Sequence, residues 1–135
     1  MKRILLIEDD DSLRAILRVS LEKMGHAVTE ATNGREAMGI FKKTAPNLVL
    51  TDLIMPEIEG LETIRAMRRA QPELKIIAMS GGGRSDSRDN LNMAKNFGAT
   101  AVFAKPFSFK ELHKVIDELL ADATPDNSDP VFIAE

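Results

Sequence analysis

The sequence has no cysteine, no long apolar run and no strong excess of either charge. Without cysteine, disulfide bonds, thiolate metal sites and thiol nucleophiles are all excluded. No stretch approaches the roughly 18 consecutive apolar residues that a membrane-spanning helix requires. The formal net charge is -3 with both signs interleaved, so neither nucleic acid nor an anionic membrane surface is an expected partner.

The start of the chain has the charged-then-apolar order of a signal peptide for only a few residues. Met1 to Arg3 precede four apolar residues, Ile4 to Ile7, and the acidic run Glu8 to Asp11 follows. A signal peptide needs a longer apolar core, so we expect a cytoplasmic protein. With 135 residues, 44% of them apolar, the chain is long enough to bury the core of one domain.

Strand-like and helix-like patterns alternate five times along the chain. Short apolar runs suit strands buried on both faces of a parallel sheet, and helical repeats of apolar residues follow them. The alternation predicts an α/β fold, a (βα)5 doubly wound parallel sheet with helices on both faces. The expected strands are 4–7, 27–31, 48–51, 74–79 and 101–104, and the first helix is expected to face inward with Leu13, Ile16, Leu17, Leu21 and Met24.

Capping residues predict where several helices begin, and composition predicts where the domain ends. Asp10 or Asp11 suits the start of the first helix, while Asn33 with Glu36 and Ser108 with Glu111 are spaced as capping boxes. A domain built from these elements would span residues 1–121. Residues 122–135 are rich in Asp, Pro and other turn formers, which predicts a flexible C-terminal tail.

Polar residues stand at the carboxyl ends of four of the expected strands. Glu8 and Asp9 follow the first strand, Asp52 the third, Ser80 the fourth and Lys105 the fifth. Open α/β sheets bind their ligands at this edge. We therefore expect these side chains to share one crevice.

Three carboxylates in one crevice repel one another, so either one of them takes up a proton or a cation binds among them. At about 5 Å and an effective dielectric near 20, each pair of charges repels by roughly 3 kcal/mol. Oxygen ligands with room for water favour Mg2+, or the similar Mn2+, over zinc. With Lys105 and the Ser80 hydroxyl added, the set describes phosphoryl transfer to Asp52.

Four motifs resemble the signature of the response-regulator receiver domain. They are Ile-Leu-Leu-Ile-Glu8-Asp9-Asp, Leu-Thr-Asp52-Leu-Ile-Met-Pro56, Met-Ser80-Gly and Ala-Lys105-Pro106-Phe. They occur in the family's order at the expected strand ends, and the resemblance covers roughly residues 2 to 121. It implies the flavodoxin-like strand order 2-1-3-4-5.

The resemblance also implies a role for each site residue. Asp52 would accept the phosphoryl group of a histidine kinase or histidine phosphotransfer protein, with Glu8, Asp9, Asp52 and the Ile54 carbonyl holding the metal. Ser80, Gly81 and Lys105 would bind the phosphoryl group and switch with it, and Lys105-Pro106 would be a cis peptide. Phosphorylation would alter binding to a downstream protein, and the last helices would offer a homodimer contact.

The sequence departs from the family pattern at three positions. The usual inward-turning aromatic, three residues before the lysine, is Val102, and the chain has no tyrosine. Ile54 and Gly82 stand where other receivers place polar side chains that orient water. We therefore expect slow loss of the phosphoryl group, measurable as the decay of the phosphorylated mass.

Two other functions remain open at this point. An aspartyl phosphatase or phosphotransferase would want an acid two residues after its nucleophile, where this chain has Ile54. A pseudo-receiver, a pure interaction module that is not phosphorylated, would suit Val102 but not the intact acidic set. His26 and His113 are isolated in the sequence, and we expect both to be surface residues rather than ligands.

Overall fold

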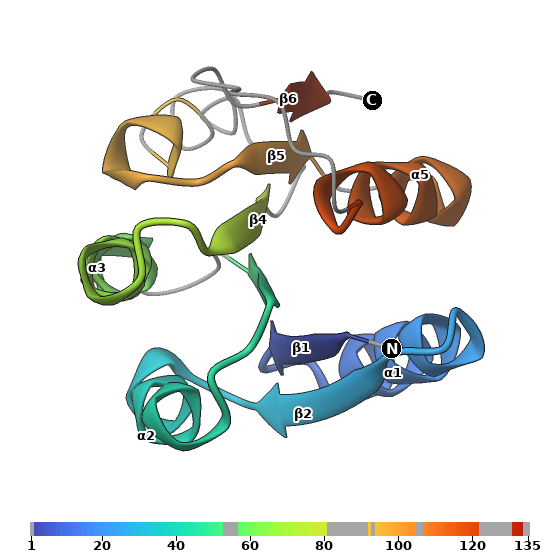
Figure 1. Ribbon diagram of the computed structural model, residues 1–135, viewed down its shortest axis with the longest axis horizontal. Coiled ribbons are helices and arrows are strands. Elements are labelled where there is room, and N and C mark those ends of the chain that lie inside the picture. The colour runs from blue at the N-terminus through green and yellow to red at the C-terminus, as the bar shows by residue number, and fades with distance from the viewer. Residues whose placement is uncertain are drawn as a thin grey trace.

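The computed structural model describes residues 2–52, 57–80, 92, 94–104, 107–121 and 131–133. Strands and helices alternate along these residues (Figure 1). The strands are β1 (Arg3–Ile7), β2 (Ala27–Ala31), β3 (Leu48–Asp52), β4 (Lys75–Ser80), β5 (Ala101–Ala104) and β6 (Val131–Ile133). The helices are α1 (Asp11–Lys23), α2 (Gly34–Thr44), α3 (Glu57–Ala70) and α5 (Phe109–Leu119), and residues 94–97 are helical as well.

All pairings in the sheet are parallel, and the strand order is β2-β1-β3-β4-β5-β6. The predicted α/β class and the order 2-1-3-4-5 are confirmed. The sixth strand was not predicted. It lies within residues 122–135, which were expected to form a flexible tail, and it pairs with the outer edge of β5.

Side chains of the predicted caps begin three helices. The carboxylate of Asp10 accepts a hydrogen bond from the Leu13 amide at 3.0 Å, at the start of α1. The side chain of Asn33 starts α2 and the hydroxyl of Ser108 starts α5 in the same way. Each satisfies one of the amides that a helix leaves unpaired in its first turn.

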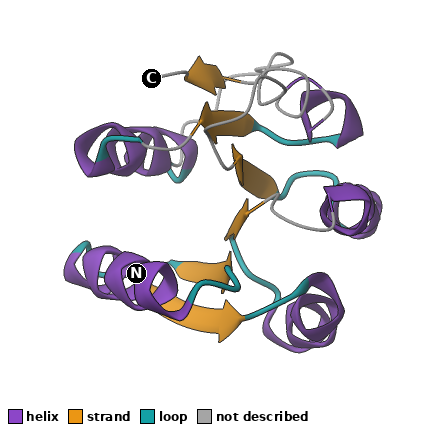
Figure 2. Cartoon of the chain, turned by 180° about the vertical axis from the view of Figure 1, so that it is seen from behind, coloured by secondary structure: helices purple, strands orange, loops and turns teal. Residues whose placement is uncertain are grey.

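The sheet is covered on both faces, and each face has its own apolar layer. In Figure 2 the helices stand on the two sides of the central strands. One layer joins α2 and α3 to the sheet, with the buried residues Ala37, Phe41, Leu61, Ile64 and Met67. The other joins α1 and α5 to the opposite face, with the buried residues Leu17, Leu21, Leu112, Val115 and Ile116. Alternate residues of β1, β3, β4 and β5 lie in opposite layers, as the period of two requires.

The prediction that Ile16 faces inward is wrong. Its side chain is 54% exposed, and Val19 is 52% exposed on the same helix. Leu17 and Leu21, four residues apart, are fully buried and define the inner face of α1. Consecutive residues of a helix point about 100° apart, so Ile16 turns away from the layer that buries Leu17.

The two histidines are half-buried, in contrast to the expectation of surface residues. Both ring nitrogens of His26 are buried, with no hydrogen-bond partner in the described part of the chain. The ring of His113 on α5 hydrogen-bonds to the hydroxyl of Ser20 on α1. His113 therefore links the two helices that cover one face of the sheet.

A guanidinium fixes the turn that leads into β5. The helical run 94–97 ends at Gly98, which has a φ of 123°. Arg68 of α3 donates to the Gly98 carbonyl from Nε at 3.2 Å and from a terminal nitrogen at 2.8 Å. The end of α3 and the entry to β5 are thereby joined.

No helix in the described residues has both the length and the apolar character to cross a membrane.

Candidate metal and phosphoryl site

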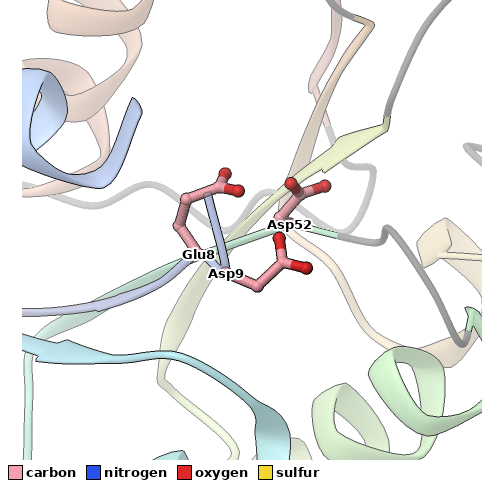
Figure 3. Close-up of side chains that lie close together, drawn as sticks. All are labelled: Glu8, Asp9 and Asp52. Atoms are coloured by element: carbon pink, nitrogen blue, oxygen red, sulfur yellow. The ribbon is translucent and has the colours of Figure 1, made fainter. Parts of the chain in front are cut away.

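Three carboxylates meet at the carboxyl ends of two neighbouring strands. Glu8 and Asp9 directly follow β1, and Asp52 is the last residue of β3. The two strands pair in parallel, with Ile7 opposite Thr51, so their ends reach the same edge. Figure 3 shows the three carboxyl groups turned toward one another. One oxygen from each lies within 4.8 Å of the others.

The three carboxylates differ in their access to water. Glu8 is 1% exposed, Asp52 is half-buried and Asp9 is exposed. An ion held by this set would contact protein oxygens on its inner side and keep waters on the side of Asp9. Mg2+ retains several waters in this manner and is bound through only a few carboxylates. The donor set therefore fits a hard divalent cation.

Hydrogen bonds within the loop hold Glu8 in place. The Glu8 carboxylate accepts a bond from the Asp10 amide at 3.1 Å. The Glu8 carbonyl accepts a bond from a terminal nitrogen of Arg14 at 2.9 Å. Both contacts order the chain between β1 and α1, which carries two of the three acidic groups.

Arg14 was not identified as a site residue from the sequence. It pairs with Asp11 at 2.7 Å and with Glu30 of β2 at 2.9 Å, in addition to the Glu8 carbonyl. Hydrogen bonds to Asp11 and Glu30 raise the pKa of the Arg14 guanidinium. The pKa of Glu30 is lowered, chiefly by its hydrogen bond with Arg18; burial opposes this shift, and the hydrogen bond with Arg14 adds to it. The i,i+3 spacing of Asp11 and Arg14 was the available signal.

Ser80 lies at the same edge as the carboxylates. It is the last residue of β4 and is 1% exposed. β4 pairs with β3, and Met79 stands opposite Asp52 in the register. Ser80 is therefore one residue beyond the acceptor candidate, on the adjacent strand.

Several predicted site residues lie outside the described part of the chain. They are Ile54, Gly81, Gly82, Lys105 and the Lys105-Pro106 peptide. The structure brings together Glu8, Asp9 and Asp52, and it places Ser80 on the next strand.

Val102 is a core residue in the middle of β5. It is fully buried and packs in the layer of α2 and α3. Its partner in the register is Ala78 of β4. A buried valine has no polar group and little volume to move, so this position has no aromatic that could turn between exposed and buried states.

Comparison with known proteins identifies the family. A family model described as the response regulator receiver domain matches residues 4–117. The chain belongs to the response regulator receiver domain family. The response regulator receiver protein CpdR of Brucella abortus (strain 2308) is 35% identical over 91% of this chain and 100% of its own length.

The receiver fold also appears in solved structures and in longer regulators. A response regulator receiver domain protein from Clostridium thermocellum superposes with a TM-score of 0.80 at 26% identity, covering 89% of this chain and 94% of its own. Response regulator MprA of Mycolicibacterium vanbaalenii is 34% identical over 93% of this chain, which spans only 53% of that relative. Receiver domains are signalling phosphoacceptors that bind Mg2+ at an acidic pocket and interact with histidine kinases or phosphotransfer proteins.

Proposed function

We propose that this receiver accepts a phosphoryl group on Asp52 from a histidine kinase or histidine phosphotransfer protein and signals by altered binding to a partner. The observation that carries the proposal is the set of three carboxylates, whose oxygens lie within 4.8 Å of one another at the ends of β1 and β3. Asp52 is half-buried at the end of a strand, so its carboxylate is held in one place and still open to a donor.

The residues at the site have three tasks in this proposal: metal binding, positioning of Glu8 and binding of the phosphoryl oxygens. Glu8, Asp9 and Asp52 hold Mg2+ or Mn2+, together with the Ile54 carbonyl. A bound divalent cation supplies positive charge that offsets the charge of the transferring phosphoryl oxygens. Arg14 keeps Glu8 in position through its carbonyl. Ser80, Gly81 and Lys105 bind the phosphoryl oxygens.

The bonds that form and break in the transfer belong to the donor and Asp52. One Asp52 oxygen forms a bond to phosphorus while the bond between phosphorus and the donor's imidazole nitrogen breaks. The imidazole keeps the electron pair of that bond and takes up a proton from water. The product is an acyl phosphate on Asp52.

Intact-mass measurement after incubation with Mg2+ and phosphoramidate, a small phosphodonor, tests this function. We expect the mass of one phosphoryl group on the wild-type chain and on Glu62→Gln, an exposed carboxylate of α3 outside the cluster. Asp52→Asn is expected to gain none. A phosphoryl group on Asp52→Asn would contradict the assignment of the acceptor.

The second candidate is the pseudo-receiver, and Val102 is the observation that favours it. Its buried position without an aromatic side chain suits an interaction module that does not respond to phosphorylation. Absence of any mass gain in the wild-type chain would support this function. Continuous release of phosphate from the donor would instead support the phosphatase class.

The identity of the partners follows only in part from the family. A cognate histidine kinase, a downstream partner protein and a homodimer through the last helices are predicted. The slow loss of the phosphoryl group, expected from Ile54 and Gly82, is also a prediction. A pull-down tests whether phosphorylation alters partner binding. A receiver that responds to phosphorylation should bind different proteins in its phosphorylated and unphosphorylated states, whereas a pseudo-receiver should bind the same ones.

A further inference from the structure

The sixth strand covers the outer edge of the sheet. Val131–Ile133 form β6, which pairs in parallel with β5 on the side opposite β4 (Figure 1). Val131 is opposite Ala101, Phe132 opposite Val102 and Ile133 opposite Phe103. Three consecutive residues of β5 therefore have a partner strand on both sides.

β5 is a strand that suits such a cover. Ala101, Val102 and Phe103 are each fully buried. With β4 as its only neighbour, β5 would present a row of unpaired backbone groups beside this apolar strand. An exposed edge of that kind is a template for pairing with another chain. The segment Val-Phe-Ile consists of the β-branched and aromatic residues that strands favour.

The connection from β5 to β6 has an unusual hand. The β1–α1–β2 and β3–α3–β4 units step across the sheet in opposite directions, and α1 and α3 lie on opposite faces. These two units therefore share one hand. The β5–α5–β6 unit steps in the same direction as β3–α3–β4, but its helix lies on the face of α1. It has the opposite hand.

This reversal makes the pairing of β6 within one chain an uncommon topology. About 98% of parallel crossovers are right-handed, because a twisted strand that feeds a helix packs back onto its sheet in that way. If the shared hand of the first two units is the usual one, β5–α5–β6 is left-handed. A strand donated by another copy of the chain pairs with β5 without making this crossover.

We propose that the outer edge of β5 is a strand-binding site whose occupant, Val131–Ile133, is exchanged between two copies of the chain. This segment fits the site because the structure shows it paired in register with β5. Residues 120–130 separate α5 from β6, and at about 3.3 Å per extended residue they span up to roughly 36 Å. That reach is enough for a neighbouring copy. The proposal does not depend on phosphorylation of Asp52.

The absence of native cysteine makes the exchange directly measurable. Adjacent strands lie about 4.8 Å apart, within the range of about 4.4–6.8 Å between the Cα atoms of a disulfide. Ala101→Cys and Val131→Cys are placed in separate full-length chains, one of them labelled with 15N. The chains are mixed at several concentrations and oxidised. Mass spectrometry under non-reducing conditions then identifies which chains are joined.

We expect a disulfide between the two kinds of chain, with a yield that rises with protein concentration. The control pairs Ala101→Cys with Ala123→Cys, outside β6, and should give at least tenfold less of the mixed product. A single chain carrying both substitutions reports pairing within one copy. Closure within that chain at every concentration, with no mixed product above the control, would overturn the proposal. Absence of either disulfide would overturn it as well.

A second pair of variants keeps the proposal testable if cysteine at the buried position 101 prevents folding. Successive backbone amides of a strand point to opposite edges of that strand, so either the Val131 or the Phe132 amide faces β5. Val131→Pro with Phe132→Pro removes both amides and therefore removes the donor that faces β5. Light scattering should show that this double variant has lost the dimer of the wild-type chain. Asn127→Pro with Ser128→Pro, two prolines before β6, should retain it. Equal dimer in both double variants, or a wild-type chain that stays monomeric at every concentration, refutes the exchange.

Discussion

Arg14 supports the acidic cluster without belonging to it. Its guanidinium holds the Glu8 carbonyl at 2.9 Å while pairing with Asp11 and Glu30. Groups that orient metal ligands through hydrogen bonds contribute to metal affinity, and their loss typically lowers it by about 10–100-fold. Arg14 is therefore the residue that connects the helix α1 to the geometry of the site.

Replacement of Arg14 is expected to weaken Mg2+ binding. In Arg14→Ala the Glu8 carbonyl loses its donor and the loop between β1 and α1 gains freedom, so we expect an increase of about tenfold in the Kd for Mg2+. Isothermal titration calorimetry of the unphosphorylated chain measures it. Arg35→Ala, an exposed arginine of α2, is the matched control. Equal Kd values for the two variants would refute the positioning role.

His26 makes the stability of the fold depend on pH. Burial lowers the pKa of its ring, while the charge of Asp117 opposes the shift and those of Lys2 and the N-terminus add to it. An unfolded histidine titrates near pH 6.5, so the folded state binds the proton less readily than the unfolded state. The stability that this difference contributes is present above about pH 6.5 and is lost as the pH falls below it.

Urea unfolding at pH 8 and pH 5.5 measures the contribution of His26. The wild-type chain should lose more free energy of unfolding between these values than His26→Gln, which has no ring to protonate. Other titrating groups are common to both proteins and cancel in the comparison. His113→Gln, which removes the other histidine and its bond to Ser20, is the control. An identical loss in wild type and His26→Gln would show that His26 does not couple folding to pH.

At the scale of elements, α2 and α3 are in close contact at Gly34. A Cβ atom added at Gly34 would lie 2.3 Å from the hydroxyl oxygen of Thr63. Thr63 belongs to α3 and is buried. The first turn of α2 is therefore seated against α3 only because residue 34 has no side chain.

Gly34→Ala is expected to destabilise the fold by about 1–3 kcal/mol, the usual cost of overpacking. Removal of the Thr63 side chain should recover part of that loss, so Gly34→Ala with Thr63→Ala should be more stable than the sum of the single changes predicts. Gly39→Ala is the control, since a Cβ there meets nothing within 4 Å and alanine favours helix by about 1 kcal/mol. Chemical denaturation of the wild type, the single variants Gly34→Ala and Thr63→Ala, their double variant and Gly39→Ala provides the comparison, and strictly additive losses would contradict the contact.

For the whole molecule, the sequence predicted the elements whose burial is most complete. β1, β3 and β4 are apolar runs covered on both faces, so composition alone marks them. The position of Ile16 was predicted wrongly because the spacing of apolar residues along α1 suits a wide apolar face, whereas the fully buried residues of α1, Leu17 and Leu21, form a narrow one. β6 was missed since three residues in a segment rich in Asp and Pro form a strand only through pairing with a distant one.

The candidate site was predictable to the extent that its residues end strands. Glu8, Asp9, Asp52 and Ser80 were expected at one edge because parallel strands bring their carboxyl ends together, and the structure places them so. Arg14 was not predictable in this way. Its position on a helix gives no indication that its side chain reaches back to the Glu8 carbonyl, since that contact depends on how α1 packs against β1 and β2.

The clustering of Glu8, Asp9 and Asp52 implies a trade-off between activity and stability. When a chelator removes metal ions, each pair of these charges repels by roughly 3 kcal/mol at 5 Å and an effective dielectric near 20. Folding brings the charges together against this repulsion. Asp52→Asn removes two of the three pairs. This variant, which we expect to be inert as an acceptor, should therefore have a higher melting temperature than the wild type without metal. A lower melting temperature would show that the carboxylates do not repel one another. Signalling capacity is then retained at a cost in stability, as is common at functional sites.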